Sequence, residues 1–488
     1  MRKNLLLSTA FFLFCQLSLT AQKKKLPNPT DNLQWQALQD IQSQYDTYKK
    51  TALQIWDYAE VGYKEVKSSA LLQQTLKENG FAIETGVAGI PTAFVATYGS
   101  GQPVIGILAE YDALPGLSQK VSADKEPIAG KDAGHGCGHH LFGTASVAAG
   151  IEIKKLIEEK KFTGTIKVFG CPAEEGGSGK VYMVRAGLFN DVDAVIHWHP
   201  DAENDANMGS ALANKSAKFR FRGLSAHAAA APDKGRSALD AVEAMNNMVN
   251  MMREHIPMET RIHYVITSGG KAPNVVPDYA EVYYYVRHPK REQVKEIFDR
   301  VVLAAKGAAM GTETKMEMEI IGGTHDLLPN KTLAEIMNQN LRKTGGVQYT
   351  EAEKSFAQKI QSSFTYKVPP ISFSDSIKAF SGIIVPLAGG GSTDVGDVSY
   401  VVPTVGLSTA TWVPGTPAHS WQAVASGGTD IGVKGMMVAA KTIALTAIDL
   451  YMNPAIIQKA KAEFKIQLGD YKYEALLGDR KPALNYRD

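Results

Sequence analysis

The stretch TIKVFGCPAEEGGSGKVYMVRAGLFNDVDAVIHWHP, residues 165–200, decides the fold. It contains two strand-like runs, 165–170 and 193–198, and each run ends in polar residues. Two earlier runs of the same kind lie at 92–98 and 103–108, and an Ala-rich helical stretch follows them. Strands that alternate with helices predict an α/β fold with a doubly wound, mostly parallel sheet. In such sheets the chemistry lies beyond the carboxyl ends of the strands, which is where the acids and histidines of this stretch fall.

A second, smaller domain is predicted in the middle of the chain. Residues 213–325 hold four candidate strands and two candidate helices in the order β-α-β-β-α-β, which fits a ferredoxin-like α+β layer. The segments on either side return to helix and strand patterns. We therefore predict a catalytic domain in two parts, residues 31–212 and 326–488, with the smaller domain inserted between them.

The N-terminus has the layout of a secretory signal peptide over residues 1–21, because Arg2 and Lys3 precede the apolar run 5–19 and small residues follow it. The alternative is an N-terminal anchor helix, although the run is short for a membrane span. Residues 22–30 are predicted to be a linker. We therefore expect an exported protein that is either periplasmic or secreted.

Composition excludes several classes of protein. The 488 residues are 44% hydrophobic and 21% charged, which is ordinary for a globular protein and argues against disorder or a coiled coil. Lysine plus arginine total 52 and acidic residues 50, so no basic excess draws the chain to nucleic acid or anionic lipid. Beyond the N-terminus we expect no apolar run long enough to cross a membrane. We predict no nucleic-acid partner and no membrane attachment once the signal is removed.

Three cysteines are too few for a disulfide scaffold. Cys15 lies in the predicted signal peptide and would leave with it. In an oxidising compartment the remaining two, Cys137 and Cys171, either pair with each other or at least one of them is occupied by something else.

Histidines, a cysteine and acids gather in four short motifs. They are HGCGHH (135–140), PAEEGGSGK (172–180), HWHP (197–200) and PAHSWQ (417–422). Each motif alone is weak, since Cys-x-His is common and adjacent glutamates are usually solvated loop residues. Together they offer thiolate, imidazole and carboxylate groups, which suit a borderline divalent metal. The candidate ligands for two ions are Cys137, His139, Glu175, His199 and His419.

A metal-assisted mechanism also needs a general base that is not itself a ligand. Glu174 and Glu175 are neighbours directly after a strand, so their side chains point in different directions. One can therefore bind metal while the other faces the attacking water, and we predict that Glu174 is the general base.

At these residues the chain resembles the M20 family of metal-dependent peptidases and amidohydrolases, and within it the branch of the aminobenzoyl-glutamate hydrolases. The resemblance covers nearly all of the chain after the signal and rests on seven motifs in the family's order. They are LAEYDALPG (108–116), GHGCGHH (134–140), CPAEEGG (171–177), HWHP (197–200), GLSAHAAAAP (223–232), PNVVPDYAEV (273–282) and PAHSWQ (417–422). The ordered set is specific, although no single motif is.

The resemblance implies roles residue by residue. It gives the same five ligands and the same base, Glu174, and it makes the inserted domain a lid or dimerisation domain. His227 is implied to reach the partner subunit's substrate and stabilise the oxyanion, while Asn274 and Arg287 are implied to hold a substrate carboxylate. A surface role for Arg287 is equally open. The softness of thiolate and imidazole favours zinc, whereas the resemblance favours manganese.

The chain departs from the family pattern at several positions. His140 stands where many members have an aspartate, and Cys171 stands where many have a glutamine. Glu110 occupies the place of a ligand histidine in some branches, so Asp112 is the better match to the acid that orients a ligand. The alternative at Cys137 is a disulfide with Cys171, which would leave the site inactive.

The predicted function is metal-dependent hydrolysis of the amide bond of small N-acyl amino acids or dipeptides, with p-aminobenzoyl-glutamate as a candidate substrate. A metal-activated water attacks the amide and Glu174 serves as the base. The expected assembly is a homodimer, with a second subunit type left open. Two alternatives remain: a hydrolase with Cys137 as its nucleophile, and a non-catalytic metal- or ligand-binding protein on the same scaffold.

Overall fold

The computed structural model describes residues 29–384 and 391–487, and the predicted signal peptide (1–21) therefore lies outside the described residues. Most of the predicted linker, 22–30, lies outside them too, and helix α1 already begins at Pro29. The first part of the catalytic domain contains α1 (Pro29–Ser43), α2 (Tyr45–Tyr58), α3 (Val66–Glu78), β1 (Ala82–Thr85), β2 (Phe94–Ser100), β3 (Val104–Glu110), α4 (His139–Glu158), β4 (Gly164–Cys171), α5 (Glu174–Gly177), α6 (Gly179–Arg185) and β5 (Ala194–Asp201). The second part contains α9 (Lys331–Thr344), α10 (Glu351–Ser362), α11 (Val395–Ser399), β10 (Thr404–Ala410), α12 (Trp421–Gly427), α13 (Asp430–Met452) and α14 (Pro454–Leu468).

The catalytic sheet has the strand order β1-β2-β4-β3-β5-β10. Its four strands β4, β3, β5 and β10 are parallel, while β1 and β2 are antiparallel additions at one edge. Both faces are covered: Val168 of β4 touches α4 at Gly150, whereas the next residue, Phe169, stacks on Phe189 beyond α6 with ring centroids 4.4 Å apart. The predicted doubly wound, mostly parallel sheet is confirmed. Strand β1 was not predicted, because its four residues are largely exposed and carry no apolar alternation.

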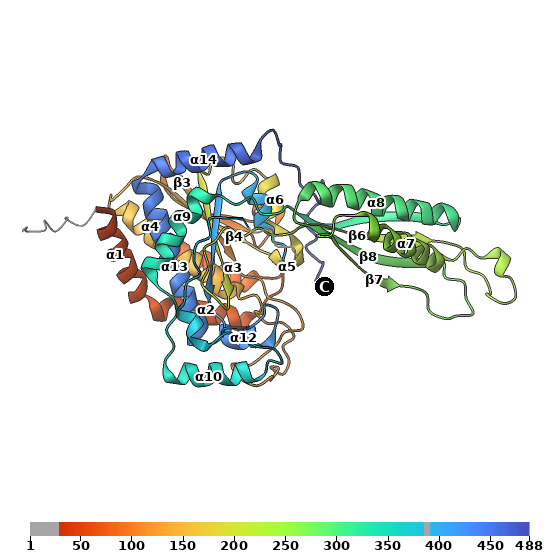
Figure 1. Cartoon of the computed structure of the whole chain (residues 1–488), viewed down its shortest axis with the longest axis horizontal. Helices are drawn as coiled ribbons and strands as arrows, with labels where there is room; N and C mark the ends of the chain where they lie inside the picture. The colour runs from red at the N-terminus through yellow and green to blue at the C-terminus, as the bar shows by residue number, and fades with distance from the viewer. Residues whose placement is uncertain (1–28, 385–390, 488) are drawn as a thin grey trace, which may run out of the picture.

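Two core helices pack against this sheet, α4 and α13 (Figure 1). Glycines let α4 approach closely, since a Cβ at Gly143 would lie 2.6 Å from the carbonyl oxygen of Glu110. Within the described part of the chain, α13 alone is long and apolar enough to cross a membrane, and 89% of its apolar stretch is buried inside the fold. The expectation of no such run beyond the N-terminus is therefore wrong for α13, which has the burial of a core helix.

The inserted domain is a separate layer that extends away from the catalytic domain (Figure 1). It is made of β6 (Ala213–Arg222), α7 (Ala238–Met252), β7 (Arg261–Ser268), β8 (Tyr279–His288), α8 (Arg291–Gly311) and β9 (Lys315–Thr324). The strand order is β7-β8-β6-β9 and every neighbouring pair is antiparallel. Apolar side chains of its sheet and two helices form a core of their own. The predicted ferredoxin-like insertion is confirmed.

One buried acid makes the stability of this fold depend on pH. Glu152 of α4 is only 5% exposed, and burial, with Asp40 nearby, raises its pKa from 4.5 to about 8. The folded state then binds the proton more tightly than the unfolded state, so this stabilisation is complete below pH 4.5 and is lost as pH rises to about 8.

Replacing Glu152 with glutamine removes that dependence. We expect Glu152→Gln to be more stable than the wild type by about 2 kcal/mol at pH 8, with the difference vanishing near pH 4. Urea unfolding at both pH values measures it. If the two proteins differed in free energy of unfolding by the same amount at both pH values, the raised pKa of Glu152 would be contradicted.

Candidate active site

Polar residues follow three parallel strands at one edge of the catalytic sheet. Strand β3 ends at Glu110, with Asp112 just beyond it, and β4 ends at Cys171, followed by α5. Strand β5 carries His199 near its end, and α4 begins at His139. Because the carboxyl ends of parallel strands meet at one edge, the fold gathers motifs that lie far apart in the sequence.

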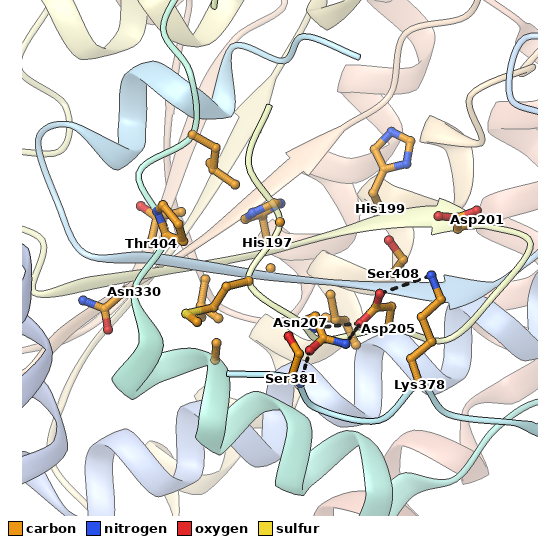
Figure 2. A pocket seen from close by; sticks show the side chains of 18 of the residues that line it. His197, His199, Asp201, Asp205, Asn207, Asn330, Lys378, Ser381, Thr404 and Ser408 are labelled. Carbon is orange, nitrogen blue, oxygen red and sulfur yellow. Dashed lines mark hydrogen bonds and ion pairs between the residues drawn. The ribbon is translucent and has the colours of Figure 1, made fainter. Parts of the chain in front are cut away.

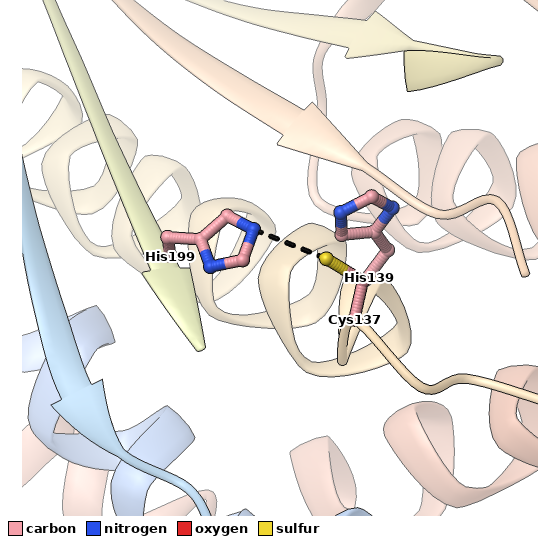
Figure 3. A group of neighbouring side chains, drawn as sticks. All are labelled: Cys137, His139 and His199. Carbon is pink, nitrogen blue, oxygen red and sulfur yellow. Dashed lines mark hydrogen bonds between the residues drawn. The ribbon is translucent and has the colours of Figure 1, made fainter. Parts of the chain in front are cut away.

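Cys137, His139 and His199 form the first group of candidate ligands (Figure 3). One ligand atom from each lies within 4.8 Å of the others, and Cys137 Sγ is 3.4 Å from His199 Nε2. Gly138 adopts φ +77°, and a Cβ there would lie 2.6 Å from the ring of Pro200. A glycine is therefore needed to turn Cys137 and His139 toward one point.

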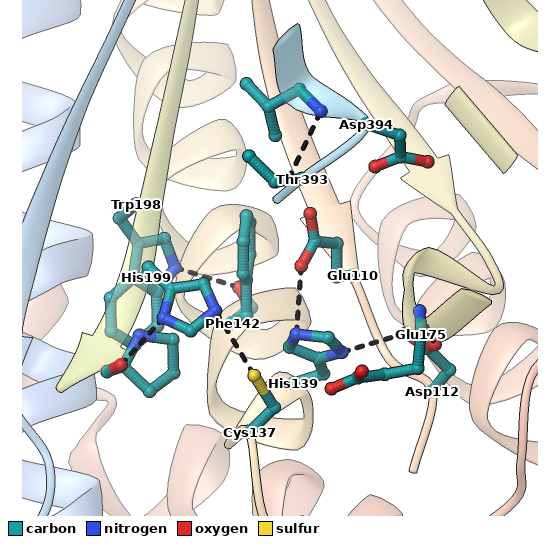
Figure 4. Close-up of polar contacts among 12 residues, drawn as sticks. Glu110, Asp112, Cys137, His139, Phe142, Glu175, Trp198, His199, Thr393 and Asp394 are labelled. Atoms are coloured by element: carbon teal, nitrogen blue, oxygen red, sulfur yellow. Dashed lines mark hydrogen bonds and ion pairs between the residues drawn. The ribbon is translucent and has the colours of Figure 1, made fainter. Parts of the chain in front are cut away.

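The two imidazoles are both held through their Nδ1 atoms (Figure 4). His139 Nδ1 donates to Asp112 Oδ1 at 2.8 Å, and His199 Nδ1 donates to the carbonyl of Pro200 at 2.7 Å. Carboxylate and carbonyl oxygens only accept, so Nδ1 of each ring carries a proton, and Nε2 is the ring atom left to bind a metal. Both rings are thus oriented with Nε2 toward the candidate ion position.

Cys137, Glu175 and His419 form the second group, again with one atom each within 4.8 Å. Glu175 Oε1 lies 3.1 Å from His419 Nε2. Cys137 belongs to both groups, so its sulfur lies between two candidate ion positions. Asp112 links the groups as well, because its Oδ2 accepts from the Glu175 N–H at 2.9 Å while Oδ1 holds His139.

The chemistry of these donors fits divalent ions. His139 Nε2 and Glu175 Oε1 are buried and have no hydrogen-bond partner among the described residues; each faces another ionisable side chain, Glu110 or His419. Burial alone would lower the pKa of His139, but Cys137 and the nearby carboxylates raise it well above its ordinary value. Such a crowded set of acids, thiol and imidazoles is what a cation would neutralise. The structure thus brings together all five residues predicted as ligands.

Glu174 stands beside these groups without belonging to either of them. Its carboxylate forms a third cluster with Glu110 and His139, with one atom each within 4.8 Å. Burial raises the pKa of Glu174 well above its ordinary range, and the charges of Glu110 and Glu175 add to this. A carboxylate with a raised pKa binds a proton readily, as a general base must.

A buried ion cluster behind the site was missed by sequence reasoning. Lys180 Nζ lies 2.5 Å from Glu110 Oε1 and 2.7 Å from Asp394 Oδ1, and all three side chains are at most 1% exposed. Burial would lower the pKa of Lys180, but the two carboxylates raise it well above its usual value. The lysine therefore stays charged and fixes Glu110 3.1 Å from His139 Nε2.

The other residues of the motifs have structural contacts. His197 packs against β10, where a Cβ at Gly406 would lie 2.3 Å from His197 Nε2. His140 Nε2 lies 3.1 Å from the carbonyl of Gly427. Cys137 and Cys171 are both free thiols, so the alternative disulfide between them is not formed.

The three predicted residues of the inserted domain are not brought to this cluster. His227 and Asn274 lie together at the distal end of the domain, where His227 pairs with Val275 and Ala228 N–H donates to the Asn274 carbonyl at 3.0 Å. Arg287 lies eight residues beyond Tyr279 along β8, roughly 25 Å away, near the junction with the catalytic domain. Asn274 and Arg287 of one chain therefore cannot hold the same carboxylate, and their joint role stays a prediction that requires the two residues to come from different subunits.

Comparison with known proteins identifies the family. A family model described as a peptidase dimerisation domain matches residues 213–312. The chain is 41% identical over 448 residues to one of the two kinds of subunit of p-aminobenzoyl-glutamate hydrolase of Escherichia coli (strain K12), a match that covers 87% of this chain and 93% of that protein. The chain belongs to the M20 family of peptidases and amidohydrolases.

Other M20 proteins extend the comparison. Xaa-Arg dipeptidase of Mus musculus is 29% identical over 431 residues, or 85% of this chain and 88% of that protein. A Bacillus subtilis structure described as a dinuclear metal-binding M20 peptidase has a TM-score of 0.56 at 14% identity, covering 84% of this chain and 99% of that one, which supports the fold. The chain is thus an M20 peptidase or amidohydrolase, and its inserted domain matches the family's dimerisation domain.

Proposed function

We propose that this M20 enzyme hydrolyses the amide bond of small N-acyl amino acids or dipeptides with the help of two divalent ions. The observation that carries the proposal is the pair of ligand groups that share Cys137, with Glu174 beside them and outside both. The first ion would be held by Cys137, His139 and His199, and the second by Cys137, Glu175 and His419.

When bound, the two ions would supply Lewis acidity that polarises the amide carbonyl and lowers the pKa of a water molecule. Glu174 accepts the proton of the attacking water and delivers it to the leaving nitrogen. Asp112 keeps the His139 ring and the Glu175 backbone in place, and the Lys180 cluster holds Glu110 still. The partner subunit's His227 is proposed to stabilise the oxyanion, because His227 lies at the far end of the inserted domain and cannot reach its own site.

A cavity of about 580 Å³ adjoins the candidate site at His199, the one proposed ligand among its lining residues (Figure 2). His197 and His199 line one end of it, and at the other end Lys378 lies 3.5 Å from Asp205. This volume is in the range that holds one small molecule. The likeness to the Escherichia coli p-aminobenzoyl-glutamate hydrolase makes p-aminobenzoyl-glutamate the first substrate to test.

Assembly, metal and location are part of the same proposal. The dimerisation domain supports an oligomer, and we propose a homodimer; the two kinds of subunit of the Escherichia coli relative leave a second subunit type as the alternative. Thiolate and imidazole donors favour zinc by softness, with manganese as the competing ion. We also propose export to the periplasm or medium, from the signal-like N-terminus alone.

A hydrolysis screen with and without chelator tests the proposal. Purified protein is assayed on p-aminobenzoyl-glutamate, hippurate-like N-acyl amino acids and simple dipeptides. We expect hydrolysis of at least one class, loss of nearly all activity after dialysis against 1,10-phenanthroline, and recovery on adding zinc or manganese, since the ions carry the Lewis acidity. Activity that survives exhaustive chelation and is abolished by iodoacetamide would instead indicate Cys137 as the nucleophile.

A further inference from the structure

The segment of residues 469–487 follows α14 and has no part in the mechanism above, yet it runs from the domain junction to the active site (Figure 1). At the junction the hydroxyl of Tyr473 donates to Asp397 Oδ1 at 2.7 Å. The hydroxyl of Tyr471 lies 2.7 Å from His325 Nε2. We call residues 469–487 the C-terminal segment.

Further along, the C-terminal segment fastens to α6, the helix that follows the two active-site glutamates. Arg185 Nη1 donates to the carbonyl of Arg480 at 2.7 Å, and the Tyr182 hydroxyl donates to the carbonyl of Lys481 at 3.3 Å. These contacts carry the chain back toward the carboxyl edge of the catalytic sheet.

The last described residues of the segment reach the candidate metal ligand Glu175. Two donors converge on its carbonyl oxygen: the Tyr486 hydroxyl at 2.9 Å and Arg487 Nη2 at 2.7 Å. The approach needs a glycine at position 62, because a Cβ at Gly62 would lie 2.2 Å from the Tyr486 hydroxyl. The Tyr486 ring also meets the Tyr63 ring edge-on, with centroids 5.5 Å apart.

The turn that carries the two glutamates, residues 173–178, needs such external support. Ala173 and Ser178 have φ of 55° and 59°, a left-handed conformation that costs a residue with a side chain of order 1–3 kcal/mol. On the other side, the N–H of Glu175 is held by Asp112, which also orients His139. The backbone of Glu175 is thus held at both its N–H and its carbonyl.

We propose that Tyr486 and Arg487 are positioning residues for this turn: by holding the Glu175 carbonyl they place Glu175 against the second ion position and Glu174 against the substrate. The inference rests on the proposed function for its catalytic consequence. Neither Tyr486 nor Arg487 takes part in a chemical step. They nevertheless give a role in the reaction to a segment that lies some three hundred residues from the turn in sequence.

The test compares variants that remove the two donors with a matched control. The variants are Tyr486→Phe, Arg487→Met, the double variant, and Arg487→Lys, which retains a donor. The control is Tyr473→Phe, which removes a hydroxyl of the same segment that bonds elsewhere. We expect the double variant to lose about 10- to 100-fold in kcat with KM nearly unchanged, Arg487→Lys to recover much of the Arg487→Met loss, and Tyr473→Phe to stay within twofold of wild type.

Amide hydrogen exchange gives a readout that does not depend on the substrate. In the double variant the Glu175 amide and its neighbours in the turn should exchange faster than in the wild type, while α4 and α13 stay protected. A double variant with wild-type kcat, or with unchanged exchange in the turn, overturns the inference. A wild type that hydrolyses no amide would overturn the proposed function instead, and hydrogen exchange would still decide whether the segment holds the turn.

Discussion

Replacing Glu174 with glutamine should lower kcat by about a thousandfold while the protein keeps its fold and its metal. Glutamine has nearly the shape of glutamate but cannot accept the proton of the attacking water. Glu174 lies in neither of the two ligand groups that share Cys137, so its loss should leave both ion positions intact. The measurement is kcat on the best substrate of the screen, together with the number of ions bound per chain.

A matched control shows whether the loss of any carboxylate would lower kcat, or only the loss of the one at Glu174. Glu84→Gln removes a carboxylate on the exposed edge strand β1 and should leave turnover unchanged. Unaltered turnover in Glu174→Gln would rule out Glu174 as the general base. Loss of metal in that variant would show instead that Glu174 is a ligand.

Removing the thiol of Cys137 should have the second large effect, because its sulfur belongs to both ligand groups. We expect Cys137→Ala to bind fewer than one ion per chain and to lose about a thousandfold in kcat/KM, as loss of metal chemistry would. Elemental analysis of the dialysed protein measures the ions. Cys171→Ala is the control, since Cys171 is the other buried thiol and donates to the carbonyl of Phe169.

An aspartate at position 137 distinguishes a ligand from a nucleophile. A carboxylate can still bind a divalent ion, so Cys137→Asp should regain part of the metal and of the activity that Cys137→Ala loses. If Cys137 were the nucleophile, with His199 at 3.4 Å as its base, the aspartate variant would be as inactive as the alanine variant.

The local motifs were sufficient to predict which residues meet at the site. Cys137 and His139 are one glycine apart, and the strand patterns put Glu175 and His199 at the same edge of a parallel sheet. The spacing of Cys137 and His139 can be read within three residues, and the positions of Glu175 and His199 follow from the geometry of parallel strands. His419 was predicted from its own motif, PAHSWQ (417–422), and the order of the family motifs agreed with it.

Contacts between distant segments could not be predicted in the same way. Lys180 and Asp394 are 214 residues apart, and nothing in either neighbourhood indicates a buried ion pair. Likewise, no periodic pattern shows that Tyr486 and Arg487 return to the Glu175 turn. Motif matching also does not show that the length of strand β8 separates Asn274 from Arg287, so that a joint role of the two residues would need two subunits.

The central claim, that two ions share the Cys137 sulfur, is tested most directly by anomalous diffraction from crystals of the zinc- or manganese-loaded protein. We predict two anomalous peaks per chain, about 3.5–4 Å apart. One peak should touch His139 and His199, the other Glu175 and His419, and both should contact Cys137 Sγ. A single peak, or peaks that lie away from Cys137, would contradict it.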